Sequence, residues 1–175
     1  MKLFKHLKTV RTHRRAVRKM CFRCGLIKQG LLHDLSKYSL AELIPSVKYW
    51  TGKRAPSELE IEERGYSEAW LHHMGRNKHH FEYWVDIAHG NPYIVCDMPL
   101  RYIAEMFCDR VGASKTYLGD KYTDRSPLEY ALSKTEGDEL FMSAHTRETL
   151  LGWLTDLAEH GEDYVCREIR EAVRG

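Results

Sequence analysis

The N-terminal segment shows the period of an amphipathic helix. Apolar residues recur at spacings of three, four and seven over residues 3–24, and Gly25 follows them as a natural stop. His6 and His13 fall on the same stripe. The pattern therefore predicts a helix over 3–24 whose apolar face also carries two histidines.

Helical periodicity continues along most of the remaining chain, and strand-like alternation is nearly absent. Loops or turns are expected where Gly, Pro and polar residues gather, at 51–57, 89–93 and 118–127. The remaining predicted helices cover 26–36, 39–51, 58–74, a stretch after Gly75 and Asn77 to about 89, 99–118, 127–136, 144–160 and 162–173. The sequence thus predicts an all-α fold, a compact bundle of about seven helices in one domain over 1–175.

Two of these helices carry local signals. The stretch 26–36 contains the sequence LLHDLSK, which places His33 and Asp34 on a short helix. Ser39 stands before the next helix with Glu42 three residues later, which is a capping-box pattern.

Composition restricts the class of protein. The chain has 175 residues, of which 43% are hydrophobic and 30% charged, as is ordinary for a soluble globular protein. We find no run of about 18 apolar residues, so no membrane partner is expected. The N-terminus lacks the apolar stretch of a secretory signal, and we expect a cytoplasmic location.

Charge is unevenly distributed. Residues 1–30 carry ten Lys or Arg and no Asp or Glu, which leaves 17 basic and 25 acidic residues, a balance of −8, for the rest. A basic segment can bind nucleic acid or another polyanion, or it can pack on an acidic body. We favour packing because the segment also has an apolar stripe, so nucleic acid is open as a partner but not favoured.

The five cysteines do not predict a disulfide framework, because their number is odd and their spacing irregular. Cys21 and Cys24 form a lone CxxC motif, and no second CxxC completes a four-thiolate zinc site. We interpret both as ordinary helix residues.

Histidines gather in the stretch WLHHMGRNKHHFEYW, which contains two histidine pairs seven residues apart. On a continuous helix, one face would carry His73, Asn77, His80 and Trp84. A neighbouring face would carry His72, His79 and Tyr83. One member of each pair should therefore point inward, and we choose His73 and His80, with His72 and His79 as alternates. The other histidines in turns or polar stretches are interpreted as ordinary: His89, His145 and His160.

Asp109 lies inside an apolar helical run, where burying an unpaired carboxylate would cost several kcal/mol. A metal ion would supply the missing partner. Imidazoles and carboxylates without thiolates suit one or two divalent ions that keep open positions for water. Asp34 beside His33 can bridge two ions, and Lys37, one helical turn away, can reach a substrate phosphate. Asn77 is assigned to substrate binding as well.

The order of these residues resembles that of the HD-domain superfamily of metal-dependent phosphohydrolases. His13 in HRRAV matches the family's first histidine, and His33-Asp34 in GLLHDLSK matches its His-Asp pair. The inserted histidines of two-metal members would come from the pairs at 72–73 and 79–80, and HHFEYW is similar to the HHE-x-W stretch of the members that hydrolyse cyclic dinucleotides. Asp109 in CDRVGA matches the late aspartate. The blocks HDLSKYS and HHxxNxHHxEYW also resemble an uncharacterised bacterial and phage family. The resemblance covers about 10–115, and the additional helices of 116–175 match no family.

The chain departs from the HD pattern in three ways. His13 and His33 are closer in sequence than in most members, and so are the inserted histidines. The GYP signature of cyclic dinucleotide hydrolases does not follow HHFEYW. Cyclic dinucleotide hydrolysis is therefore not supported.

The resemblance implies a phosphohydrolase in which a metal-bound hydroxide attacks a nucleotide or another small phosphate ester. Asp34 and Lys37 would be the catalytic residues. One ion would be held by His13, His33, Asp34 and Asp109. A second ion, bridged by Asp34, would be completed by His73 and His80. The expected cofactors are one or two of the ions Fe, Mn, Zn, Co, Ni or Mg.

Two other functions fit the same residues. Some HD-domain proteins are di-iron oxygenases, and a mixed His/Asp set suits iron equally well. A non-enzymatic helical module that binds polyanions through the basic N-terminal segment is the other alternative. A homodimer stays open, because the sequence carries no signal for or against it.

Overall fold

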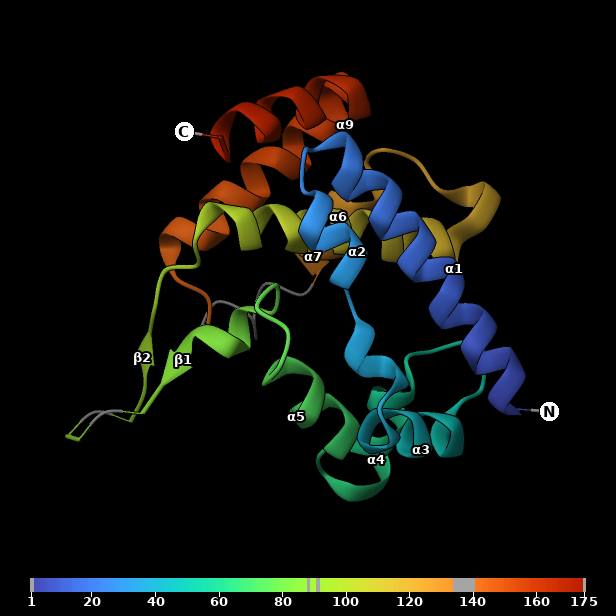
Figure 1. The fold of residues 1–175 in the computed structure, drawn as a ribbon. Coiled ribbons are helices and arrows are strands. Elements are labelled where there is room, and N and C mark those ends of the chain that lie inside the picture. Colours follow the sequence, from blue (N-terminus) through green and yellow to red (C-terminus); the bar gives the residue numbers. More distant parts are fainter. Residues whose placement is uncertain (1, 88, 91, 134–140, 175) are drawn as a thin grey trace.

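The computed structural model describes residues 2–87, 89–90, 92–133 and 141–174 (Figure 1). Within these residues the fold is all-α, as the sequence predicted, and eight α-helices are present. They are α1 (Lys2–Arg23), α2 (Ile27–Leu32), α3 (Leu40–Tyr49), α4 (Pro56–Arg64), α5 (Glu68–Met74), α6 (Leu100–Leu118), α7 (Ser126–Ser133) and α9 (Ala144–Ala172).

Short elements connect these helices. Three 3-10 helices are η1 (Leu35–Tyr38), η2 (Phe81–Trp84) and η3 (Gly119–Lys121). Two short strands, β1 (Val85–Asp86) and β2 (Ile94–Val95), pair antiparallel, with Val85 opposite Val95. In Figure 1, α9 lies on one side of α6, whereas α3, α4 and α5 lie together on the other side of the molecule.

The core lies where α1, α6 and α9 meet. Val17 of α1, Phe107 of α6 and Leu157 of α9 are fully buried in one apolar cluster. α1 and α6 approach closely at Gly112, because a Cβ atom there would lie 2.4 Å from Cγ2 of Val17. This contact fixes the spacing of the two helices that carry His13 and Asp109.

The predicted helix over 3–24 is confirmed as α1, and it packs on the rest of the protein through its apolar stripe, as favoured from the sequence. Val10, Val17 and Met20 are buried on the side that faces the body. The cations of residues 2–19 are exposed, apart from the half-buried Arg14. Hydrophobic burial therefore decides the orientation of α1.

The predicted helix over 26–36 is interrupted at the His-Asp motif. α2 ends at Leu32, and Asp34 has φ 54° and ψ 27°, in the left-handed region. Among the described residues other than glycine, Asp34 alone has a positive φ. Aspartate is one of the few residue types that tolerate this conformation, and the motif is thus a junction between α2 and η1 rather than part of a helix.

Two further predictions are wrong in their boundaries. The predicted helix over 58–74 is divided into α4 and α5 at Gly65, which has φ 80° and ends α4. The predicted helix to about 89 is replaced by a turn, η2 and β1. One reason is that the Asn77 side chain donates a hydrogen bond to the carbonyl of His73 at 2.7 Å, which helps to end α5.

The C-terminal helices agree better with the sequence. α7 begins one residue before the predicted 127, and residues 134–136 of that prediction lie outside the described residues. α9 is assigned as one helix, but Gly161 inside it has non-helical angles, so the division predicted between 160 and 162 is a kink. Asn91, in the turn predicted at 89–93, also lies outside the described residues.

Two properties of the described residues bear on the chain's environment. The five cysteines are free thiols, and Cys24 and Cys166 meet in the core with their sulfur atoms 3.4 Å apart. None of the helices described here has the length and apolar character needed to cross a membrane.

Candidate metal centre

Asp34 lies at the centre of a buried cluster of histidines and carboxylates. Its side chain is 1% exposed, and its two oxygens face different partners. Oδ2 lies 3.5 Å from Nε2 of His13 and 3.5 Å from Nε2 of His33. Oδ1 lies 3.3 Å from Nε2 of His73 and 3.5 Å from Nε2 of His79. Because the backbone at Asp34 is left-handed, its carboxylate stands between the two halves of the cluster.

The first half joins residues of three segments. His13 comes from α1, His33 from the junction after α2, and Asp109 from α6. Oδ1 of Asp109 lies 2.9 Å from Nε2 of His13 and 3.3 Å from Nε2 of His33. With Asp34, these residues offer four ligand atoms that all lie within 4.8 Å of one another.

The second half uses the turn that replaced the predicted helix. His73 is the sixth residue of α5, and His79 and His80 precede η2. These three histidines and Asp34 again offer four ligand atoms within 4.8 Å of one another. The ring of Trp70 stands edge-on to His80, with the centroids 4.8 Å apart, and covers this half of the centre.

Most of the atoms at the centre have no hydrogen-bond partner. They are buried, and they come close to one another without the alignment of hydrogen bonds. The atoms that lack an aligned hydrogen bond are Nε2 of His13, His33, His79 and His80, both carboxylate oxygens of Asp34, and Oδ1 of Asp109. Of these, Oδ2 of Asp34 has the Lys37 ammonium as an ion-pair partner at 2.8 Å. Buried polar atoms without partners are costly, and lone pairs that converge in this way fit metal ligands. The residues present therefore fit two divalent metal ions.

Two buried glutamates hold the outer nitrogens of these histidines. Oε1 of Glu105 lies 3.1 Å from Nδ1 of His33 and 3.3 Å from Nδ1 of His79. Oε2 of Glu42 lies 2.9 Å from Nδ1 of His73. A carboxylate on Nδ1 orients a ligand histidine and makes Nε2 a better donor to a metal.

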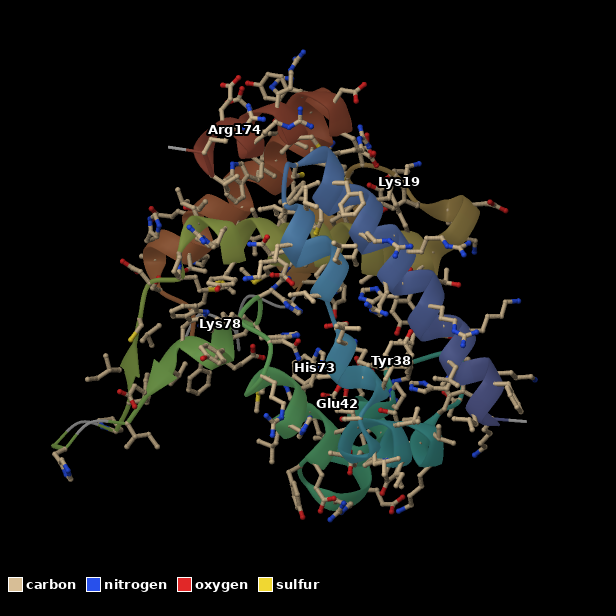
Figure 2. The ribbon with its side chains drawn as sticks, in the orientation of Figure 1. Lys19, Tyr38, Glu42, His73, Lys78 and Arg174 are labelled. Atoms are coloured by element: carbon tan, nitrogen blue, oxygen red, sulfur yellow. The ribbon has the colours of Figure 1, made fainter. Side chains whose placement is uncertain are left out.

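Sequence reasoning missed both glutamates. Glu42 was predicted to form a capping box with Ser39, but the Ser39 side chain caps nothing. Figure 2 shows Glu42 of α3 lying beside His73 of α5 instead. Glu105 stands one helical turn before Asp109 in the same apolar run, and this spacing is the signal that could have identified it.

The histidine pairs differ from each other. In the first pair His73 faces the centre, while Nδ1 of His72 lies 2.8 Å from Oε1 of Glu42 and its Nε2 accepts from Arg76. In the second pair both His79 and His80 face the centre. The expectation that one member of each pair points inward depended on a continuous helix, and the turn after Gly75 removes that constraint.

Asn77 lies beside the centre in a supporting position. Its amide nitrogen donates to the carbonyl of His73 at 2.7 Å and to Oγ of Ser36 at 2.9 Å. Asn77 does not line the cavity described below. The structure therefore gives it contacts that position His73, and the predicted role in substrate binding is not supported by its placement.

A cavity of about 140 Å³ opens beside the centre. His13, His73 and Lys37 form its boundary with the centre, and Nζ of Lys37 lies 2.8 Å from Oδ2 of Asp34. The remaining lining includes the aromatic side chains of Trp50, Trp70 and Tyr117, together with Arg54 and the carboxylate of Glu42. A small anionic molecule in this cavity would meet both Lys37 and the ligand atoms of the centre.

The electrostatics of the centre keep the carboxylates ionised. Burial alone would raise the pKa of Asp34, but His33, Lys37 and His13 outweigh it and hold that pKa well below its usual range. His13 and His33 likewise outweigh burial at Asp109 and hold its pKa well below the usual range. Burial would also lower the pKa of Lys37, yet Asp34 and Asp109 raise it, so the ammonium stays charged.

The pKa values of two histidines, one in each half, shift in opposite directions. Burial opposes the charged form of His33, but Asp34, Asp109 and Glu105 together raise its pKa well above the usual value. Burial, with His79 and His73 close by, holds the pKa of His80 well below its usual value. His80 is therefore neutral near pH 7, the form in which imidazole binds a metal.

Comparison with known proteins gives a family and no activity. Residues 2–156 match a family of unknown function, DUF5662, and the chain belongs to that family. No curated protein and no solved structure matches the chain. The family description names no chemistry, so the resemblance to HD-domain proteins stays a prediction.

Proposed function

We propose that the protein is a metal-dependent phosphohydrolase with a centre of two divalent ions. The observation that supports this most is that the two carboxylate oxygens of Asp34 face different groups of histidines. Oδ2 faces His13 and His33, and Oδ1 faces His73 and His79. A carboxylate placed in this way is suited to bridge two ions. The unpartnered ligand atoms on both sides support the same proposal.

Two such ions, when bound, supply a nucleophilic hydroxide at neutral pH and neutralise charge on a phosphate. The chain's own residues then have separate tasks. Glu105 and Glu42 orient the ligand histidines, and Trp70 covers the second half of the centre. Lys37, which is charged and lines the cavity, binds the phosphate group of the substrate.

The proposed substrate is a small phosphate ester, of which nucleotides are one class. The cavity beside the centre joins cations to the rings of Trp50 and Trp70. Cations suit the phosphate, and the rings suit an apolar or aromatic leaving group. The residues that line the cavity therefore support a small phosphate ester as the class of substrate.

The proposal is tested by phosphate release from a panel of nucleotides and aryl phosphates, using protein loaded with each candidate ion. We expect release by the wild-type protein and a loss of at least roughly tenfold in turnover for Lys37→Met, which keeps its metal. Lys53→Met, in an exposed loop, is the matched control and should leave turnover unchanged. Metal-loaded protein that releases no phosphate from any ester would contradict the proposal.

A further inference from the structure

The outer face of α1 carries a continuous stripe of cations. Lys8, Arg11, Arg15 and Arg18 follow one another at spacings of three and four residues, which places them along one side of the helix. All four side chains are exposed. The stripe lies on the side of α1 away from buried Val10 and the rest of the packed face.

No acidic side chain among the described residues forms an ion pair with this stripe. Residues 1–30 contain ten Lys or Arg and no Asp or Glu, so the segment itself cannot neutralise it. Arg23, at the C-terminal end of α1, does pair with Glu162 and Asp163, which shows that acidic partners are used elsewhere on the same helix. The positive potential of the stripe is therefore available to a polyanion.

Two shallow hollows follow the stripe. The first is lined by Phe4, Leu7, Lys8, Arg11, Thr12 and Arg15. The second is lined by Arg11, Arg14, Arg15, Arg18, Gly30 and Tyr38, and so lies between α1 and the α2–η1 segment. Arg11 and Arg15 line both hollows, which makes the two a single track along the helix.

Aromatic rings stand at both ends of this track. Phe4 is 76% exposed and Phe22 is 40% exposed, and both continue the spacing of the cationic stripe. The rise of a helix separates them by about 27 Å. Tyr38 lies beside α1 (Figure 2), with the Arg14 guanidinium 5.2 Å from its ring centroid. Cations that track a backbone, joined to rings on which bases stack, characterise surfaces that bind single-stranded nucleic acid.

An anionic membrane surface fits this face less well. A helix that lies on a membrane buries a continuous apolar face, with its cations on the opposite side. On α1 the apolar face is already buried in the protein, and the four positions between Phe4 and Phe22 on the stripe are all charged. The arrangement therefore favours an extended polyphosphate chain over a bilayer.

We propose that the stripe of Lys8, Arg11, Arg15 and Arg18 binds single-stranded DNA or RNA, with Phe4 and Phe22 stacking on bases. This inference goes beyond the proposed hydrolase and does not depend on it, because the stripe lies on the opposite side of α1 from His13. Binding to phosphates should be independent of sequence and should weaken as salt increases.

The test is the fluorescence anisotropy of labelled single-stranded oligonucleotides of about 15 nucleotides, titrated with the purified protein over a series of salt concentrations. We compare the wild type with Arg11→Glu/Arg15→Glu. The control Lys53→Glu/Lys121→Glu makes the same change of net charge at exposed sites elsewhere. We expect the α1 variant to bind at least roughly tenfold more weakly. The slope of log K against log salt should also become shallower by about 1.4, because each of the two lost phosphate contacts contributes about 0.7. The control should stay close to wild type.

Circular dichroism and metal content, measured on the same samples, separate this result from a failure to fold or from loss of the metal centre. Three results would overturn the proposal: no binding at low salt, an equal loss in both double variants, or tighter binding to anionic lipid vesicles than to oligonucleotides. Equal binding of a duplex of the same length would overturn the assignment to single strands.

Discussion

At the scale of single residues, three candidate ligand histidines have a glutamate at the ring nitrogen that faces away from the centre. His33 and His79 share Glu105, and His73 is held by Glu42. Asp34 is defined by its backbone, because the left-handed conformation directs its carboxylate between the two halves of the centre. These supports distinguish ligands from ordinary buried histidines and lead to two predictions.

The first prediction concerns the pair at 72 and 73. His73→Ala should remove the ion of the second half, because Nε2 of His73 faces Oδ1 of Asp34. His72→Ala should keep that ion, since His72 only pairs with Glu42 and Arg76. Metal content per protein chain measures both. If the two variants bound the same amount of metal, the assignment of His73 over His72 would be wrong.

The second prediction concerns Glu105. Glu105→Gln keeps the size of the side chain but removes the charge that orients His33 and His79, so metal binding should weaken about 10- to 100-fold. Competition with a chromogenic chelator measures the affinity. Glu159→Gln, at an exposed site on α9, is the control. An affinity equal to wild type in Glu105→Gln would show that the glutamate is not part of the metal centre.

At the scale of the elements, the centre depends on how closely α1 packs on α6. Gly112 permits this approach, since a Cβ atom there would lie 2.4 Å from Cγ2 of Val17 and 3.0 Å from its backbone nitrogen. The same two helices supply His13 and Asp109. Their separation therefore influences both stability and the geometry of the ligands.

Gly112→Ala should lower the free energy of unfolding by about 1–3 kcal/mol, because the new methyl group overpacks this contact. Gly152→Ala is the matched control: this glycine is also helical, a Cβ atom there would meet nothing within 4 Å, and the change should stabilise by about 0.5–1 kcal/mol. Urea denaturation measures both. Equal stabilities of the two variants would contradict the close packing of α1 on α6.

Some elements could be predicted from the sequence and others could not. Long helices with clear periodicity, such as α1 and α6, follow directly from their apolar spacing, and the all-α class follows from them. The junction at Asp34 was not predicted, and the break expected at Gly75 and Asn77 leads into a turn and η2 instead of a further helix. Asp34 is placed by contacts with side chains distant in sequence, and α5 ends partly through the local bond from Asn77 to the carbonyl of His73. Hydrophobic periodicity encodes neither kind of polar contact.

Of the residues of the centre, too, some were predicted from the sequence and others were missed. The sequence singled out Asp109 because a carboxylate in an apolar run needs a partner, whereas His13, His33 and Asp34 were matched to the pattern of the HD-domain proteins. His79 was only an alternate, because on a continuous helix it would lie on a different face from His80. The glutamates were missed because each supports a histidine that is distant in sequence, 31 residues away for Glu42 and His73.

At the scale of the whole molecule, the centre joins segments from residue 13 to residue 109. Ions bound there would therefore hold α1, α5 and α6 to one another. Bound ions would also give partners to buried polar atoms that otherwise lack aligned hydrogen bonds. Stability should consequently depend on metal.

Chelation should lower the melting temperature. Ions at a free concentration 100 times their dissociation constant stabilise the folded state by about 2.7 kcal/mol. For a domain of this size that corresponds to a decrease of about 5–10 °C on their removal. Differential scanning calorimetry of metal-loaded protein, with and without chelator, measures the change. A melting temperature that does not respond to chelator would contradict tightly bound ions.

The central claim is a two-metal centre bridged by Asp34, and the most direct measurement is the metal content of purified and reconstituted protein by elemental analysis. Asp34→Asn is the informative variant, because asparagine tolerates the left-handed backbone and changes only the charge. His160→Ala, which removes an exposed histidine on α9, is the control. We predict two equivalents of divalent metal in the wild type and control, and loss of both in Asp34→Asn. No metal in the wild type after reconstitution, or two equivalents retained in Asp34→Asn, would contradict the account.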